Sequence, residues 1–111
     1  MNNREYNITS AVRGKQNGVF GNTAVSFNST NTKGLVNLHG NIIAEIDFSR
    51  KKVKIFNRGW KSNTTKSRLN CTLEGLRCKY RLAQRKGRWY LLNQDLSVFK
   101  EFSEGMVVSF D

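Results

Sequence analysis

The chain has 111 residues, 38% of them hydrophobic, and a formal net charge of +11. This length suits one domain with a single core, and the apolar content excludes a wholly disordered chain. The sequence has neither a run of about 18 apolar residues for a membrane-spanning helix nor an apolar segment near its start for a secretory signal, so we expect a cytoplasmic protein without membrane contacts.

Positive charge is concentrated in the middle third of the chain. Residues 50–88 contain 14 Lys or Arg and 1 acidic residue, a net charge of +13, whereas residues 1–49 sum to +1 and residues 89–111 to −3. Such a cluster attracts polyanions and repels cationic partners. The charge pattern therefore predicts a partner that is nucleic acid or an acidic protein surface.

The first part of the chain, residues 1–20, is polar and weakly patterned, and we interpret it as an N-terminal arm or an irregular strand. Residues 21–111 then form a single domain. Apolar residues predict strands over 22–28 and 35–38, and the polar run between them predicts a loop. The turn-forming sequence His39-Gly40-Asn41 redirects or bulges the chain.

The clearest hairpin combines residues 42–48 with residues 52–57, which both alternate apolar and polar side chains. A turn centred on Arg50-Lys51 places Asp47 opposite Lys54 on the polar face. A four-residue loop with the same register is an equal alternative, because Arg and Lys are not the residues that two-residue turns prefer.

Residues 62–76 are predicted to form the only helix. Three leucines at helical spacing form an apolar stripe that packs on the sheet: Leu69, Leu73 and Leu76. Lys66 and Arg68 lie in the first turns of this helix, and we expect both to point away from the stripe. The backbone amides at the helix start add an anion-binding group.

A second hairpin is predicted over residues 79–92, with its turn at Lys86-Gly87. This register places Leu82 opposite Leu91. The opposite face is basic and includes an aromatic side chain: Arg81, Arg85, Arg88 and Tyr90. Two short strands, residues 98–102 and 105–110, end the chain.

The order of these elements predicts an α+β fold. We expect a mostly antiparallel sheet of about five to seven strands with one helix packed on one face.

Groups for enzyme chemistry are sparse. His39 is the sole histidine, and we interpret it as a turn residue. No nucleophile is found at a recognisable spacing from a catalytic base, and no glycine-rich phosphate-binding motif is evident. Cys71 and Cys78 are too few for a disulfide scaffold or a four-ligand zinc site, and we expect reduced thiols. Glu45 and Asp47 share one strand face and could hold a divalent metal in a nuclease, but we favour the alternative that they balance neighbouring lysines. We therefore expect no catalytic residues, no metal and no cofactor.

Phosphate binding needs cations on a firm scaffold, and the predicted elements supply them. They come from the first hairpin, the segment before the helix, the helix start and the second hairpin. Together with two aromatic residues, the predicted nucleic-acid-binding residues are Lys51, Lys52, Lys54, Arg58, Trp60, Lys61, Lys66, Arg68, Arg81, Arg85, Lys86, Arg88 and Tyr90.

Trp60 lies between Arg58 and Lys61, and its role distinguishes binding of single strands from binding of a duplex. An exposed ring in a basic surface stacks on unpaired bases and contributes about 1 to 3 kcal/mol per base. The alternative is that Trp60 covers the start of the helix, and the sequence leaves both open.

Four short segments, residues 38–41, 59–60, 64–70 and 86–90, carry a resemblance to a known group. With them, residues 21–110 resemble small uncharacterised proteins encoded by tailed bacteriophages. The resemblance implies a viral context, and hence the cytoplasm of a host cell. It implies no activity and no catalytic residues.

We expect a non-catalytic phage accessory protein that binds nucleic acid, DNA or RNA, through the basic face of residues 50–88, with single strands favoured. The alternative is an inhibitor or modulator that docks on an acidic surface of a host protein, such as a polymerase or a defence complex. Both functions use the same face, but phosphate binding predicts a linear fall of log affinity with log salt concentration.

Overall fold

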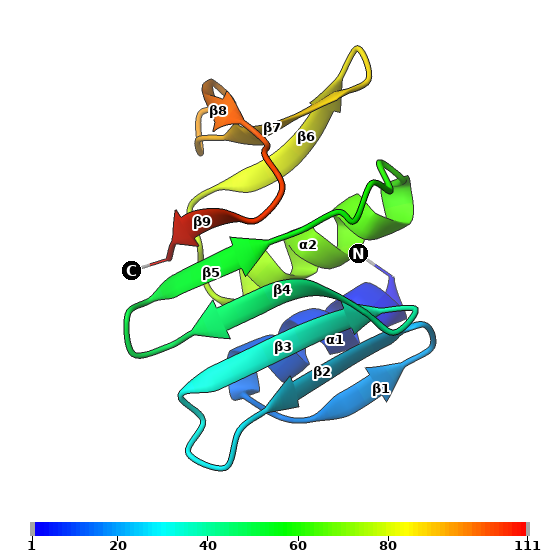
Figure 1. The fold of residues 1–111 in the computed structure, drawn as a ribbon, viewed down its shortest axis with the longest axis vertical. Helices are drawn as coiled ribbons and strands as arrows, with labels where there is room; N and C mark the ends of the chain where they lie inside the picture. Colours follow the sequence, from blue (N-terminus) through cyan, green and yellow to red (C-terminus); the bar gives the residue numbers. More distant parts are fainter. Residues whose placement is uncertain (1, 111) are drawn as a thin grey trace.

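The computed structural model describes residues 2–110, which form an α+β fold of two helices and nine strands. Both helices lie behind a six-stranded antiparallel sheet in Figure 1, and a three-stranded antiparallel sheet lies at its upper end. The predicted fold class is confirmed, with one more helix than expected. The elements are α1 (Asn3–Gly14), β1 (Gly18–Phe20), β2 (Thr23–Phe27), β3 (Lys33–Leu38), β4 (Asn41–Asp47), β5 (Lys52–Ile55), α2 (Asn63–Gly75), β6 (Arg81–Arg85), β7 (Arg88–Leu92), β8 (Val98–Glu101) and β9 (Met106–Ser109).

The two sheets contain different parts of the chain. The strand order is β1-β2-β3-β4-β5-β9 in the larger sheet and β6-β7-β8 in the smaller one. Because both helices cover the same face of the larger sheet, its other face is exposed to solvent, and we call it the open face. No helix within residues 2–110 is long and apolar enough to cross a membrane.

Residues 3–14 form a helix, so the prediction of an arm or irregular strand over residues 1–20 is wrong there, and a strand forms only at its end, in β1. A capping box starts α1: the Asn2 side chain accepts from the Glu5 amide at 2.8 Å, and the Glu5 carboxylate accepts from the Asn2 amide at 3.1 Å. Ile8, Ala11 and Val12 lie at i, i+3 and i+4 and are buried, and α1 packs on α2. Three apolar residues in a polar segment are too weak a periodic signal to predict this helix.

The β4–β5 hairpin forms as predicted, but its register differs by two residues. Asp47 lies opposite Lys52, not Lys54, across a four-residue loop. The Arg50 amide donates to the Asp47 carboxylate at 3.1 Å, and Lys51 has a left-handed φ of 54°, which together close the loop at this length. A shift of two residues keeps every side chain on its face, so the alternation of apolar residues cannot distinguish the two registers.

The register of the β6–β7 hairpin and the extent and apolar stripe of α2 match their predictions. Leu82 lies opposite Leu91, and Lys86-Gly87 forms the turn with φ values of 53° and 78°. The helix α2 starts after Ser62, whose hydroxyl accepts from the Thr65 amide at 3.1 Å.

One hydrophobic core joins both sheets and both helices. The three leucines of the α2 stripe are buried in it, and Trp89 connects the smaller sheet to the same cluster. The helices approach closely at Gly75, where an added Cβ would lie 2.7 Å from the Val12 Cβ and 2.8 Å from the Thr9 carbonyl oxygen. The core therefore holds the exposed basic elements in fixed positions.

Candidate nucleic-acid interface

A line of basic and aromatic side chains follows β5 across the open face. The strand alternates, so that Lys52 and Lys54 are exposed while Val53 and Ile55 are buried. In the loop that follows, Phe56 is half-buried, Asn57 is buried, and Arg58 and Trp60 are exposed. We call this line the β5 row; it consists of Lys52, Lys54, Phe56, Arg58 and Trp60.

Several hydrogen bonds hold the loop that ends the β5 row. The Glu104 carboxylate accepts from the amides of Asn57 and Arg58 at 2.7 and 2.8 Å. The Asn57 side chain accepts from the Gly59 amide at 2.8 Å, and the Arg58 Nε donates to the Ile42 carbonyl at 2.7 Å. This loop is therefore a firm support for the side chains it presents.

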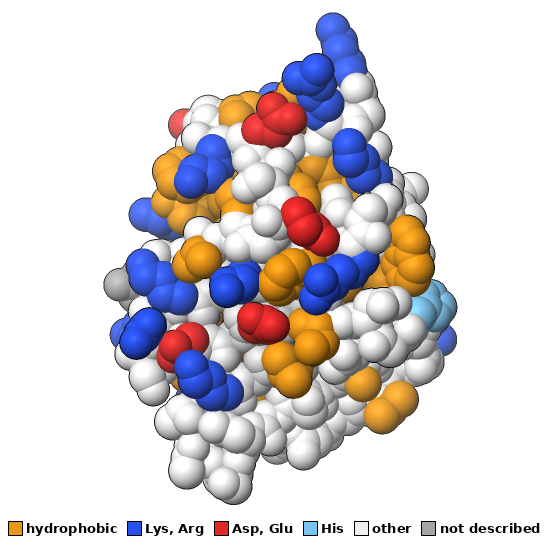
Figure 2. Space-filling model, in the orientation of Figure 1, with side chains coloured by type: hydrophobic (Ala, Val, Ile, Leu, Met, Phe, Trp, Pro, Cys, Tyr) orange, Lys and Arg blue, Asp and Glu red, His pale blue; other side chains and the backbone are white. Residues whose placement is uncertain are grey.

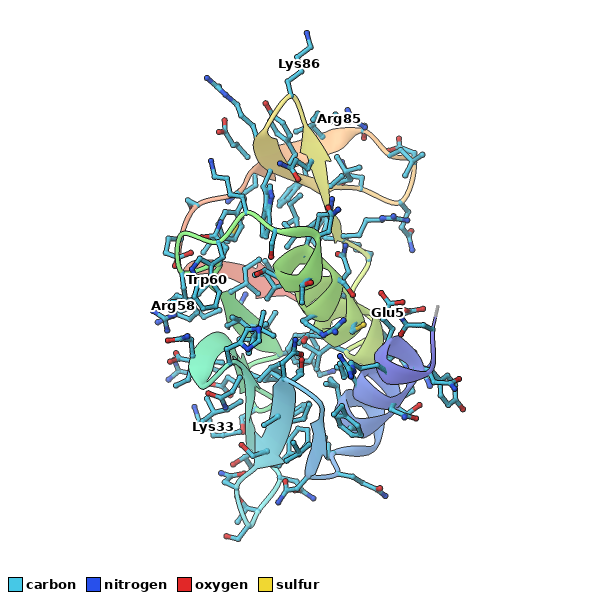
Figure 3. The ribbon with its side chains drawn as sticks, turned by 90° about the vertical axis from the view of Figure 1, so that its right-hand side faces the viewer. Glu5, Lys33, Arg58, Trp60, Arg85 and Lys86 are labelled. Atoms are coloured by element: carbon cyan, nitrogen blue, oxygen red, sulfur yellow. The ribbon has the colours of Figure 1, made fainter. Side chains whose placement is uncertain are left out.

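Trp60 is 44% exposed at the end of the row. Its ring meets His39 of the β3–β4 turn edge to face, with centroids 6.1 Å apart. The Arg58 guanidinium covers the Phe56 ring at 4.2 Å. Figure 3 shows Lys33, Arg58 and Trp60 toward one side of the molecule and Glu5 toward the other. Nearly half of the surface of Trp60 is thus open to solvent.

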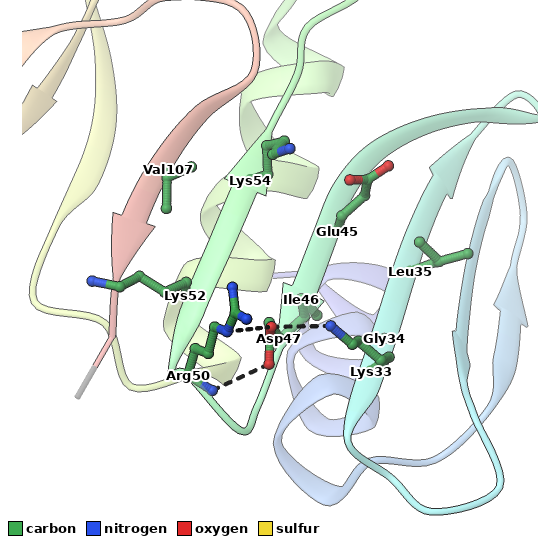
Figure 4. Close-up of a pocket in the computed structure, with 10 residues that line it drawn as sticks. All are labelled: Lys33, Gly34, Leu35, Glu45, Ile46, Asp47, Arg50, Lys52, Lys54 and Val107. Atoms are coloured by element: carbon green, nitrogen blue, oxygen red, sulfur yellow. Dashed lines mark hydrogen bonds and ion pairs between the residues drawn. The ribbon is translucent and has the colours of Figure 1, made fainter.

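Acidic side chains interrupt the positive charge on the open face. The Lys33 Nζ lies 3.0 Å from the Asp47 carboxylate and the Arg50 Nε lies 3.9 Å from it, as Figure 4 shows. The hydrogen bond from Lys33 holds the pKa of Asp47 below its usual value. Glu45 lies opposite Lys54 in the sheet. These residues line a shallow depression of about 590 Å³ on the open face.

Glu45 and Asp47 are the pair that the sequence offered as a candidate metal site. Asp47 is instead paired with two cations, and within residues 2–110 no three side chains of His, Cys, Asp or Glu lie close enough together to hold a metal ion. Cys71 and Cys78 are free, and burial raises the pKa of both thiols.

A second basic group lies at the far end of the smaller sheet. We call it the hairpin cluster; it consists of Arg81, Arg85, Lys86, Arg88 and Tyr90. The turn of β6–β7 presents three of its cations within four residues, and the Arg85 Nη2 donates to the Leu96 carbonyl at 3.2 Å. In Figure 3 the labelled Arg85 and Lys86 lie at one end of the molecule, away from Arg58 and Trp60. The predicted site residues therefore form two groups.

Arg68 belongs to neither group, and its predicted exposed position is wrong. Only 7% of this residue is exposed. The Arg68 Nε donates to the Thr23 hydroxyl at 3.0 Å, and its Nη1 donates to the Ser67 hydroxyl at 3.0 Å. Ser67 donates in turn to the Glu5 carboxylate at 2.6 Å, which lowers the pKa of Glu5. This network joins α2 to α1 and β2, so we no longer place Arg68 in the interface.

The other predicted residues lie at the margins of the two groups. Lys51 is exposed in the β4–β5 loop, Lys61 is exposed after Trp60, and Lys66 is half-buried in the first turn of α2. Lys33 was missed, because it is 17 positions before the basic segment and only strand pairing brings it to the open face. Figure 2 shows Lys and Arg side chains across this face, with Asp and Glu among them.

Comparison with known proteins extends the resemblance seen in the sequence. Neither the curated proteins nor the solved structures contain a significant match to the chain. A match to a protein family covers residues 1–109, and thus includes α1 as well as the segments that carried the resemblance to phage proteins. That resemblance is confirmed: the chain belongs to the Kyanoviridae Gp96 protein family, a family of cyanophage proteins whose function is unknown.

Proposed function

We propose that this protein binds single-stranded nucleic acid along the β5 row and carries out no chemistry on it. The observation that supports this proposal is a line of exposed cations that ends at the exposed ring of Trp60 on a firmly held loop. Lys52, Lys54 and Arg58 bind phosphates, and Trp60 stacks on an unpaired base.

The spacing of the row fits this role. Alternate residues of a strand are about 7 Å apart, and a stacked nucleic-acid strand advances about 3.4 Å per nucleotide. Lys52 and Lys54, which are alternate residues of β5, therefore contact phosphates about two nucleotides apart, and Arg58 and Trp60 lie beyond the end of the strand. Because Phe56 is half-buried beneath Arg58, Trp60 supplies most of the aromatic surface open to bases.

A second candidate function is docking on an acidic surface of a host protein. Val107, which lies opposite Lys54 and is 52% exposed, favours it, because a protein partner buries apolar surface that a phosphate backbone does not contact. Leu35 adds further exposed apolar surface on the same face.

Replacing Trp60 tests the first proposal. In a Trp89→Phe background, the fluorescence of Trp60 should change on addition of a single-stranded oligonucleotide, and Trp60→Ala should weaken binding by about 1 to 3 kcal/mol. Tyr6→Ala is the matched control, because Tyr6 is an exposed aromatic residue on α1, far from the row, and should leave the affinity unchanged. Matched DNA and RNA oligonucleotides measure the preference between the two.

Two results would reject single-strand stacking. One is a Trp60→Ala variant that melts at a lower temperature but binds as tightly as the unmodified protein. The other is that an acidic polypeptide, such as polyglutamate, binds as tightly as the single-stranded oligonucleotide, and that Trp60→Ala changes neither affinity. The second result would support docking on an acidic protein surface.

A further inference from the structure

We infer that the β6–β7 hairpin is a separate binding element that inserts into the major groove of duplex DNA. This inference rests on the proposed function in taking nucleic acid as the ligand, but it concerns a different surface and a different form of the ligand. It assigns a role to the hairpin cluster, which lies away from the β5 row.

The end of the hairpin is a two-stranded ribbon. Within the described residues, β8 pairs with β7 from Tyr90 to Leu92, and the Phe102 amide donates to the Trp89 carbonyl at 3.0 Å. The hairpin therefore continues without a third strand from Arg85 to Arg88. The five consecutive residues 84–88 are all exposed. Figure 1 shows this hairpin extending from the rest of the molecule at its upper end.

The dimensions of this ribbon match a major groove. A strand rises about 3.3 Å per residue, so the two steps from Gln84 to Lys86 span about 7 Å, and the Lys86 side chain extends beyond this at the tip. The major groove of DNA is about 12 Å wide and 8.5 Å deep and accepts a two-stranded ribbon, whereas the minor groove is about 6 Å wide. The major groove of duplex RNA is deep and narrow, so RNA duplex should not accept the hairpin.

The charge of the hairpin suits a groove lined by phosphates. Residues 75–94 contain six Lys or Arg and no acidic residue. Lys86 and Arg88 have no ion-pair partner within residues 2–110, unlike the paired Lys33 on the open face. The hairpin turn thus presents three cations without an ion pair among the described residues, and β8 places one acidic residue, Glu101, opposite Tyr90.

The base of the hairpin is rigid, so the ribbon loses little freedom on binding. Leu82 and Leu91 are buried opposite each other, and Trp89 is buried against Phe102 with ring centroids 5.3 Å apart. The Lys86-Gly87 turn fixes the tip.

The test compares two variants on two forms of DNA. Arg85→Ala combined with Lys86→Ala and Arg88→Ala should reduce the slope of log affinity against log salt on duplex DNA by about 2.7, because each phosphate contact contributes about 0.9. Binding of single-stranded DNA should change little. Trp60→Ala should weaken binding of single-stranded DNA and change binding of duplex DNA little. The two variants therefore test the proposal for the β5 row and the inference for the hairpin separately.

A matched control removes the same charge elsewhere. Arg77→Ala with Lys79→Ala and Lys100→Ala removes three exposed cations outside the hairpin turn and the β5 row, and should leave the duplex slope nearly unchanged. Lys86→Ala alone, at the exposed tip, should reduce the slope by about 0.9 and checks the result if the triple variant is unstable.

Insertion into the major groove also predicts which duplexes bind weakly. A duplex with bulky groups on C5 of thymine, which project into the major groove, should bind weakly, and duplex RNA should also bind weakly. Equal binding of the blocked and unblocked DNA duplexes would overturn the inference. So would a triple variant that weakens single-strand and duplex binding equally.

Discussion

Arg68 and Lys66 lie two positions apart on α2, but their surroundings differ. Arg68 is buried and donates to Thr23 and Ser67, whereas Lys66 makes no such interior contact within residues 2–110. Arg68→Ala should therefore lower the free energy of unfolding by about 2 to 3 kcal/mol, because it removes charged hydrogen bonds to Thr23 and Ser67 and leaves a cavity in their place. Lys66→Ala should change it by less than about 0.5 kcal/mol.

Urea unfolding of the two variants measures this difference. Binding of an oligonucleotide under conditions where both variants are folded supplies the second measurement. An Arg68→Ala variant that keeps its stability but loses affinity would return Arg68 to the interface and contradict the buried network.

At the scale of elements, the contact between α1 and α2 predicts that two Gly→Ala substitutions have different effects on stability. Gly75 and Gly14 are each the last residue of their helix. Gly75→Ala should destabilise the protein by about 1 to 3 kcal/mol, because the new Cβ meets Val12 and the Thr9 carbonyl oxygen at less than 3 Å. Gly14→Ala should be neutral or stabilising, because its nearest neighbour would be the Gln16 Cγ at 3.7 Å.

Melting temperatures of these two variants check the packing of the helices. If both variants are stabilised, α1 does not pack on α2 as closely as the structure has it. The Glu5 and Ser67 contact across the same helix pair would then also be in doubt.

At the scale of the whole molecule, the single core predicts one cooperative unfolding transition. Trp60 lies in the loop after β5, against the β3–β4 turn of the larger sheet, and Trp89 belongs to the smaller sheet but is buried in the shared core. Fluorescence of Trp60→Phe and Trp89→Phe variants should therefore give superimposable transitions, after correction for any difference in stability, and should coincide with the loss of circular dichroism. Loss of the Trp89 signal at lower denaturant would show that the smaller sheet unfolds by itself.

The sequence by itself determined the elements whose signals are local. The Lys86-Gly87 turn and the flanking alternation specify the register of β6–β7, and three leucines at helical spacing specify the buried side of α2. The α+β class, the concentration of charge in residues 50–88 and the likeness to phage proteins also come from sequence alone.

Tertiary structure decided the features that depend on distant partners. The helix α1 has only a short apolar stripe and is buried through its contact with α2. Arg68 is buried because Thr23, 45 positions earlier, accepts its hydrogen bond, and the β4–β5 register depends on a loop bond at Asp47. Periodicity reports which side chains share a face of an element, but only packing decides what that face meets. For the same reason, one basic segment of sequence became two surfaces, whose binding roles stay predictions.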